Sequence, residues 1–180
     1  MAVGKRFGQT KPCDHRNCGT CKSVNKKQHF RFNKKRARTT EGSCSSYNII
    51  YLIVCSLCNK IYIGRSCRAL RTRFGEHRRY FYKIVNQEPF DTHNDDFALG
   101  AHLYNDHHIN NVHEFNNIYS VCMLEICSPR VLEVKEHRYI HNLDSLSPAG
   151  LNIANPFSIA PLYRYWSFLF GVLDSYGWLL

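Results

Sequence analysis

Two apolar, β-rich runs separated by a very short connection restrict the fold of this chain more than any other feature. Residues 47–55 and 60–64 consist mostly of aliphatic and aromatic side chains, and only residues 56–59 lie between them. Runs of this length and composition predict strands, and so short a connection predicts a β-hairpin.

Four further elements are predicted after the hairpin from periodicity and from cap residues. They are a helix capped by Ser66 that extends to about residue 82, a shorter helix over residues 97–106, a strand over residues 118–126, and a helix that starts at Ser128-Pro129 and extends to about residue 143. Residues 86–96 are polar and predict a loop. The order β-β-α-α-β-α predicts an α+β fold, a small three-stranded antiparallel sheet flanked by helices.

Composition divides the chain into three parts. Residues 1–46 are basic, rich in cysteine and poor in aliphatic residues, so they bury too little apolar area to fold without a metal. Residues 47–155 have the composition of a globular unit and are long enough for one domain with a modest core. Residues 156–180 are apolar, but Arg164 and Asp174 interrupt them, so we expect this tail to pack on the domain or on a partner and not to cross a membrane.

A strong excess of positive charge indicates the class of partner. The chain has 24 Lys and Arg against 14 Asp and Glu, a formal net charge of +10. This suits nucleic acid, although ribosomal and membrane-surface proteins share it. Residues 26–38 interleave aromatic residues with cations. They predict either a solvated loop or a segment that contacts phosphate or directs nuclear import.

Clustered cysteines and histidines predict zinc sites. The chain has nine Cys and ten His, and its N-terminus carries no apolar signal segment, so we expect a reducing compartment in which such clusters bind metal. Cys55-x2-Cys58 at the hairpin tip has the spacing of a zinc half-site. His102-x4-His107 has the spacing of the other half, with His108 as an alternative to His107.

A second zinc site is predicted within residues 1–46. The expected ligands are Cys13, Cys18, Cys21 and Cys44, with His15 or His29 as alternatives to Cys44. Three cysteines remain, and we expect them to pack in the core: Cys67, Cys122 and Cys127.

Four side chains between residues 51 and 77 are together suited to one type of reaction. Tyr51 and Tyr62 lie on the two predicted strands, where cross-strand pairing brings them close. Arg73 and His77 lie four positions apart on a predicted helix and so share a face. Each residue alone has an ordinary structural explanation. Together they predict phosphodiester cleavage, which needs a phenol near the attacking water, a cation against the phosphate and a second proton-transfer group.

Phosphodiester hydrolysis also needs a divalent cation that polarises the phosphoryl oxygen. A hard ion such as Mg²⁺ prefers oxygen ligands and often takes a single protein carboxylate. The candidates are Glu125, Glu133 and Glu136. Glu133 and Glu136 fall within one helical turn, so periodicity does not separate them.

This set resembles the motifs of the GIY-YIG endonuclease family. The matching segments, in chain order, are Ile49-Ile50-Tyr51, Tyr62-Ile63-Gly64, Leu70-x2-Arg73-x3-His77, Glu136-x2-Tyr139-Ile140-x2-Leu143 and Pro148-x-Gly150-Leu151-Asn152. The resemblance implies a GIY-YIG-like nuclease fold, Glu136 as the ligand of a catalytic Mg²⁺ or Mn²⁺, and Asn152 as a residue that holds the site through hydrogen bonds. The resemblance also implies that the general base is either Tyr51 itself or His77 acting through Tyr51, and that Arg73 and Tyr62 contact the phosphate.

A narrower resemblance includes the zinc residues. A Cys-x2-Cys between the two tyrosine motifs, downstream histidines and a preceding cysteine cluster are similar to the endonuclease domain of Penelope-like retroelements, over about residues 13–155. This implies a nuclear enzyme that nicks DNA so that the freed 3′ end primes reverse transcription, with retroelement RNA or a reverse transcriptase as further partners. The alternatives are a catalytically inactive, zinc-dependent nucleic-acid-binding module and a structural or protein-interaction domain.

Overall fold

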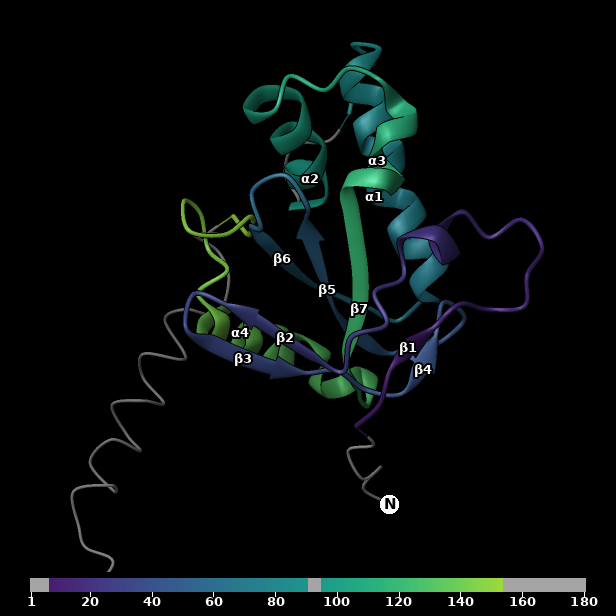
Figure 1. Cartoon of the computed structure of the whole chain (residues 1–180), viewed down its shortest axis with the longest axis vertical. Coiled ribbons are helices and arrows are strands. Elements are labelled where there is room, and N and C mark those ends of the chain that lie inside the picture. The colour runs from purple at the N-terminus through teal and green to yellow at the C-terminus, as the bar shows by residue number, and fades with distance from the viewer. Residues whose placement is uncertain (1–6, 91–94, 154–180) are drawn as a thin grey trace, which may run out of the picture.

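A three-stranded antiparallel sheet lies at the centre of the computed structural model, which describes residues 7–90 and 95–153 (Figure 1). Its strands are β5 (Ile49–Cys55), β6 (Ile61–Ser66) and β7 (Tyr119–Ile126), in the spatial order β6-β5-β7. β5 is the central strand, and all its residues are buried. The predicted α+β class and the three-stranded antiparallel sheet are confirmed.

Helices cover one face of this sheet. They are α1 (Leu70–Val85), α2 (Ala98–Ala101) and α3 (Phe115–Ile118). Their buried side chains share one hydrophobic core with Tyr51 and Tyr62. The sheet face under these helices is therefore the face that carries both tyrosines.

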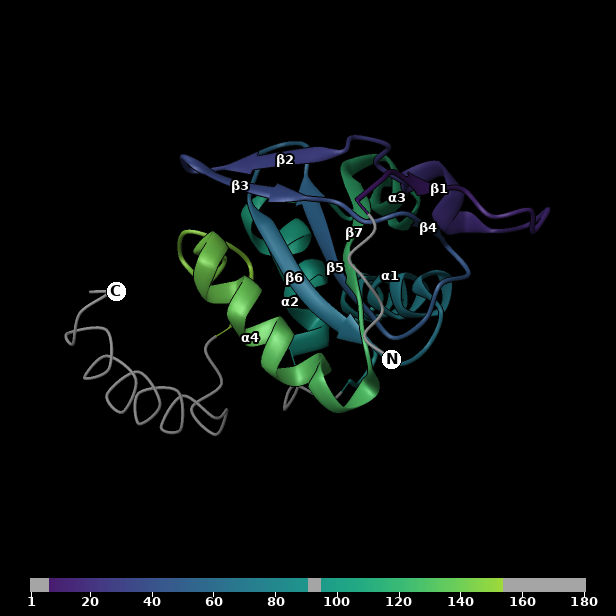
Figure 2. The ribbon, with the colours of Figure 1, turned by 90° about the horizontal axis from the view of Figure 1, so that it is seen from below.

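The opposite face is covered by a helix and a hairpin. The helix is α4 (Leu132–Leu143), and the hairpin consists of β2 (His29–Phe32) and β3 (Lys35–Arg38), which pair in antiparallel fashion. Figure 2 shows the hairpin and α4 side by side on the outside of the sheet. Phe32 and Ala37 enter a second core beneath them, so the basic run at residues 26–38 is an ordered part of the fold.

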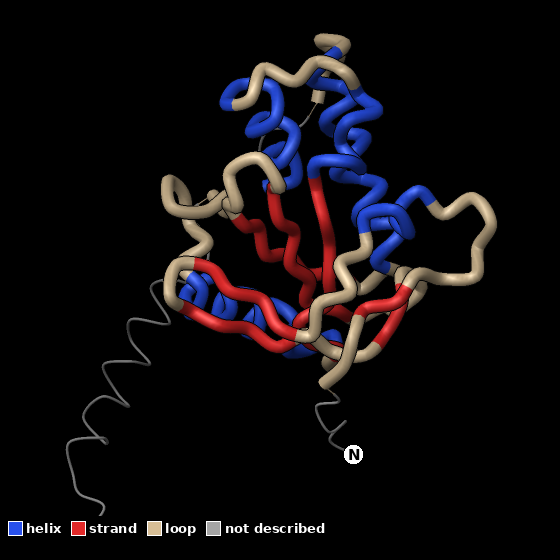
Figure 3. The backbone as a smooth tube through the Cα atoms, viewed as in Figure 1, coloured by secondary structure: helices blue, strands red, loops and turns tan. Residues whose placement is uncertain are grey.

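Short elements join these layers (Figure 3). Within the described residues they are the parallel pair β1 (Thr10–Lys11) and β4 (Gly42–Ser43), the 3-10 turns η1 (Gly19–Ser23), η2 (Asp95–Phe97), η4 (Val112–Glu114) and η5 (Pro129–Val131), and the π-helical turn η3 (His102–Asp106). η1 lies against α1 and α3. The N-terminal segment thus touches the helices as well as the sheet.

Other segments also bond to the outer edges of the sheet. The backbone N–H groups of Asn25 and Thr40 donate to carbonyl oxygens of β7 at 2.8 and 3.0 Å. On the other side, Leu151 donates its N–H to the Ile61 oxygen of β6 at 2.9 Å. The sheet is therefore held between the segment before it and the segment after α4.

Two predicted helix starts are wrong. Ser66 ends β6, and its hydroxyl accepts the N–H of Arg68 at 3.0 Å, so it closes a turn and does not cap α1. Ser128 makes no side-chain cap either, because the chain first forms a 3-10 turn from Pro129 and α4 begins only at Leu132. In both places the serine lies one turn before the helix that it was expected to cap.

The apolar segment 156–180 lies outside the described residues. Within residues 7–90 and 95–153, no helix has both the length and the apolar character needed to cross a bilayer. The expected packing of the tail stays a prediction.

Candidate functional site

The register of β5 and β6 brings the two tyrosines together on one face of the sheet. Tyr51 stands opposite Gly64, and Tyr62 stands opposite Ile53, so the two tyrosines are diagonal neighbours. Their ring centroids lie 6.3 Å apart, and both side chains are buried. The cross-strand proximity expected from the sequence is present.

Gly64 makes room for the Tyr51 phenol. A Cβ atom at this position would collide with the Tyr51 ring and hydroxyl and would lie 2.9 Å from Cε1 of Tyr62. No L side chain fits there without moving both rings. The glycine that closes the second tyrosine motif therefore has a steric role in the site.

Helix α1 brings Arg73 and His77 to the same phenol. His77 Nε2 lies 2.7 Å from the Tyr51 hydroxyl, and Arg73 Nε donates to that oxygen at 3.1 Å. His77 Nδ1 lies 3.3 Å from the backbone oxygen of Asp96, which can only accept, so Nδ1 carries the proton. Tyr51 consequently donates to His77 Nε2 and accepts from Arg73.

Asp96 is a site residue that sequence reasoning missed. Both oxygens of its carboxylate accept from the Arg73 guanidinium, Oδ2 at 2.8 Å, and Glu76 accepts a further bond from Arg73 at 3.2 Å. Asp96 therefore fixes Arg73 through its side chain and His77 through its backbone. Residues 86–96 have no periodic pattern, so nothing in the sequence points to this position.

Glu136 lies on α4 and is held by Arg65 of β6. Arg65 Nε donates to Glu136 Oε2 at 2.9 Å, while Glu133 lies 3.5 Å from the same guanidinium. The Glu136 side chain is 17% exposed and that of Glu133 is 43% exposed. Burial raises the pKa values of Tyr51 and Tyr62, and the Glu136 carboxylate adds to both shifts, so this carboxylate lies within electrostatic range of both phenols.

The third candidate carboxylate, Glu125, is bound to α4. It accepts a hydrogen bond from the Tyr139 hydroxyl at 3.1 Å and forms an ion pair with Lys135 at 2.9 Å. These bonds connect β7 to the helix that covers it. Glu125 thus has structural partners, whereas the Glu136 carboxylate lies within electrostatic range of the tyrosines.

Asn152 holds the backbone of the second tyrosine motif. Its Oδ1 accepts the Ile63 N–H at 2.9 Å, and its Nδ2 donates to the Ile63 oxygen at 2.7 Å. The amide thereby bonds to the outer edge of β6 as a neighbouring strand would. Because Ile63 lies between Tyr62 and Gly64, this pair of bonds fixes the strand on which both stand.

Burial determines the protonation states in the site. It raises the pKa of both tyrosines above their usual range, so both are neutral phenols near pH 7. It lowers the pKa of His77 to about 4, and the Arg73 guanidinium acts in the same direction. It raises the pKa of Glu136 to about 7, against the opposing effect of Arg65. The site combines a neutral imidazole acceptor with a carboxyl group that titrates near neutral pH.

Acid should destabilise the protein through His77. Its folded pKa, about 4, lies below the ordinary value of 6.5, so its contribution is intact above about pH 6.5 and is lost as the pH falls towards 4. Over this range we expect the free energy of unfolding to fall on the order of 3 kcal/mol further in the wild type than in His77→Gln. Urea unfolding of both proteins at several pH values measures this. The two proteins share every other titratable group, so only the difference between their curves is diagnostic, and parallel curves would contradict the lowered pKa of His77.

The hairpin tip and the segment after α2 form the first candidate metal site. The ligand atoms of Cys55, Cys58, His102 and His107 all lie within 4.8 Å of one another. Cys58 Sγ is 3.3 Å from His102 Nε2, and Cys55 Sγ is 3.7 Å from His107 Nε2. Asp106 binds His102 Nδ1 at 2.7 Å, which directs Nε2 towards the cysteines. This group could hold a zinc ion, with the four ligands expected from the spacing.

The local helix geometry explains how His102 and His107 meet. The single helix predicted for residues 97–106 is instead a 3-10 turn, α2 and the π-helical turn η3. Five positions apart on an α-helix, two side chains would point about 140° away from each other, whereas the wider π turn brings them to one side. The two imidazole centroids are 4.6 Å apart. The alternative ligand His108 is exposed and does not belong to the group.

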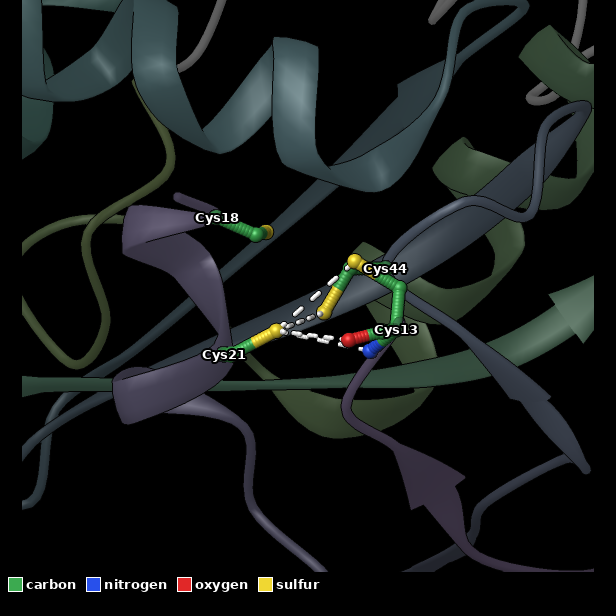
Figure 4. A group of neighbouring side chains, drawn as sticks. All are labelled: Cys13, Cys18, Cys21 and Cys44. Atoms are coloured by element: carbon green, nitrogen blue, oxygen red, sulfur yellow. Dashed lines mark hydrogen bonds between the residues drawn. The ribbon is translucent and has the colours of Figure 1, made fainter. Parts of the chain in front are cut away.

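A second candidate metal site joins the N-terminal segment to α1. Its four ligand atoms also lie within 4.8 Å of one another and belong to Cys13, Cys18, Cys21 and Cys44. Cys21 Sγ is 3.7 Å from the sulfurs of both Cys13 and Cys44, and Cys18 points towards the other three (Figure 4). This group too could hold a zinc ion. The Cys44 oxygen accepts the N–H of Arg71 at 2.8 Å, which ties the site to α1.

The remaining cysteines and histidines lie outside both groups. Neither His15 nor His29, both exposed, belongs to the N-terminal group. Cys122 is buried and Cys127 is partly buried against the core, as expected. Cys67 is exposed, so the prediction that it packs in the core is wrong. It follows the last residue of β6, where the chain has already left the sheet.

Comparison with known proteins found no family model that matches the chain, and no curated protein or solved structure that is similar to it. The functional argument therefore depends on the geometry described above. Within the described residues, that geometry brings Tyr51, Tyr62, Arg73 and His77 into contact, with the Glu136 carboxylate within electrostatic range of the two phenols and Asn152 bonded to β6.

Proposed function

We propose that this protein is a divalent-cation-dependent endonuclease that hydrolyses phosphodiester bonds in DNA. The observation that carries the proposal is the hydrogen-bonded group of Tyr51, His77 and Arg73, with the Glu136 carboxylate nearby. A phenol that donates to a buried neutral imidazole and accepts from a guanidinium is suited to proton transfer. A structural core has no need of three polar or charged side chains collected around one phenol.

The proposed reaction uses Tyr51 as a relay. Water attacks the phosphorus, and the bond from phosphorus to the 3′ oxygen breaks, leaving a 3′ hydroxyl and a 5′ phosphate. The proton of the water passes to the Tyr51 oxygen while the phenol proton moves to His77 Nε2, and solvent protonates the leaving 3′ oxygen. The raised pKa of Tyr51 favours this relay over a standing phenolate.

Arg73 and Tyr62 receive different tasks in this proposal. The guanidinium of Arg73 already binds Asp96, Glu76 and Tyr51, so its first task is to hold the phenol in place. The Tyr62 ring lies against the rings of Tyr51 and His77, and we assign its hydroxyl to the phosphate oxygen. The sequence predicts that both residues contact the phosphate, and the proposal assigns that contact to Tyr62.

Glu136 fits a hard divalent cation such as Mg²⁺ or Mn²⁺. It supplies oxygen donors, and its largely buried charge has the Arg65 side chain as its closest ion-pair partner. When bound, such an ion polarises a phosphoryl oxygen and stabilises the leaving oxygen. The Arg65 contact would hold the carboxylate in place before the ion arrives.

Charge and resemblance support the choice of DNA. The net charge of +10 suits a polyanion, and the tyrosine and zinc motifs resemble those of the Penelope-like endonuclease domain. We accordingly propose that the enzyme acts in the nucleus and that the 3′ end it frees primes reverse transcription. Retroelement RNA or a reverse transcriptase would then be a further partner, and the two cysteine-containing groups would carry structural zinc.

A plasmid-nicking assay tests the proposal. We expect the purified wild type to convert supercoiled plasmid to the open circular form only when Mg²⁺ or Mn²⁺ is added. Tyr51→Phe removes only the hydroxyl and should slow nicking by about 100-fold or more, with DNA affinity unchanged. DNA binding without nicking in the wild type would instead favour the inactive zinc-dependent module. Equal nicking by the wild type and Tyr51→Phe would overturn the relay.

A further inference from the structure

The outward face of the β2–β3 hairpin carries paired cations. Its register sets His29 opposite Arg38 and Arg31 opposite Arg36, and all four side chains are exposed. Because opposite residues in an antiparallel pair point to the same side, they form one surface, called here the basic hairpin face. The alternate positions point inwards, where Phe32 enters the core.

This arrangement carries an unfavourable electrostatic cost in the free protein. Like charges directly across a strand pair destabilise it, and Arg31 and Arg36 stand directly opposite each other. Neither has an ion-pair partner among the described residues, and no acidic residue occurs between His15 and Thr40. The inward-pointing neighbour Lys35, by contrast, forms an ion pair with Asp144 at 2.6 Å.

The hairpin holds these cations in fixed positions. Asn33 and Lys34 form its tight turn with φ values of 48° and 51°, a left-handed conformation in which glycine is the usual second residue. At its base, the Thr39 hydroxyl donates to the Gly8 oxygen at 2.6 Å. A preorganised ribbon loses less conformational freedom on binding than a mobile basic tail would.

We propose that the basic hairpin face binds the phosphate backbone of duplex DNA without sequence preference. A polyanion would relieve the repulsion between the facing arginines, and a two-stranded ribbon has the width that the major groove of B-form DNA admits. The deep, narrow major groove of duplex RNA does not admit such a ribbon. The proposal rests on the proposed DNA substrate and adds a second contact surface, on the sheet face opposite the tyrosines.

Adjacent residues on opposite sides of the hairpin provide a matched test. Arg36→Thr and Lys35→Thr remove the same charge, one from the basic hairpin face and one from the inward side. The probe is a short duplex DNA of arbitrary sequence, measured by fluorescence anisotropy at several salt concentrations without added Mg²⁺. We expect Arg36→Thr to weaken binding about 5- to 10-fold and to reduce the salt slope by about 1, with Lys35→Thr close to wild type.

The double variant Arg31→Thr/Arg36→Thr should lower the salt slope by about 2 and should melt at or above the wild-type temperature, because it removes a repulsive pair. Equal losses in Arg36→Thr and Lys35→Thr would overturn the proposal, as would an equal effect with duplex RNA as the probe. Nicking by the wild type is measured separately. A protein that nicks DNA but shows no hairpin effect refutes this inference alone, and one that binds through the hairpin but never nicks refutes the proposed function alone.

Discussion

Glu136→Gln is expected to lose Mg²⁺-dependent nicking by about 1,000-fold, while Glu133→Gln stays within about 3-fold of the wild type. The two carboxylates are a matched pair, since they stand one turn apart on α4 and both approach Arg65, at 2.9 and 3.5 Å. Burial separates them, since the Glu136 side chain is 17% exposed and that of Glu133 is 43% exposed, and the Glu136 carboxylate adds to the pKa shifts of both tyrosines, so we expect the ion at Glu136. Initial rates of plasmid nicking measure the effect.

The loss of nicking by Glu136→Gln should come from a slower reaction and not from a less stable fold. Burial raises the pKa of Glu136 to about 7, so a neutral amide at this position removes an unfavourable buried charge. We therefore expect Glu136→Gln to melt at or above the wild-type temperature and to bind duplex DNA with wild-type affinity. Nicking at the wild-type rate by Glu136→Gln would refute the assignment of the catalytic ion to this residue.

Cys58→Ser is expected to have the largest effect on stability. It removes one ligand from the group at the hairpin tip, where its sulfur lies 3.3 Å from His102 Nε2. We expect the zinc content to fall from about two ions per chain to about one, and the free energy of unfolding to fall by at least about 3 kcal/mol. Metal analysis and thermal unfolding of the purified proteins measure both quantities.

Cys67→Ser is the matched control for this change. Cys67 is exposed and belongs to neither metal group, so its replacement should alter neither zinc content nor melting temperature. Cys21→Ser should act like Cys58→Ser, because Cys21 lies between two other sulfurs at 3.7 Å each. A full zinc complement in Cys58→Ser would show that the hairpin-tip group does not bind the metal.

The sequence carried enough information to find the central sheet and the zinc ligands. Strand pairing follows from apolar runs and a short turn, and zinc ligands follow from spacing, because both depend on residues that are near in sequence. The second half of the zinc site could also be predicted, because His102 and His107 form a pair with recognisable spacing. The π-helical turn between them could not be predicted, because helical periodicity does not distinguish one extra residue per turn.

What sequence reasoning missed depends on tertiary contacts. The β2–β3 hairpin was not predicted because cations dominate the composition of this segment. Its apolar residues nevertheless share the inward side of the hairpin with the period of a strand: Phe30, Phe32 and Ala37. Asp96 was missed because it joins the site from a segment without any pattern. Serines 66 and 128 misled the helix boundaries, since a serine before a helix forms a local turn as readily as a cap.

The bonds along the outer strands have a consequence for assembly. β6 is occupied on its open side by Leu151 and Asn152, and β7 by Asn25 and Thr40. A strand from a second molecule would have to displace these bonds before it could lengthen the sheet. Fibre-like stacking of copies through their sheets is thereby obstructed, and any association between copies has to use side-chain surfaces instead of backbone pairing.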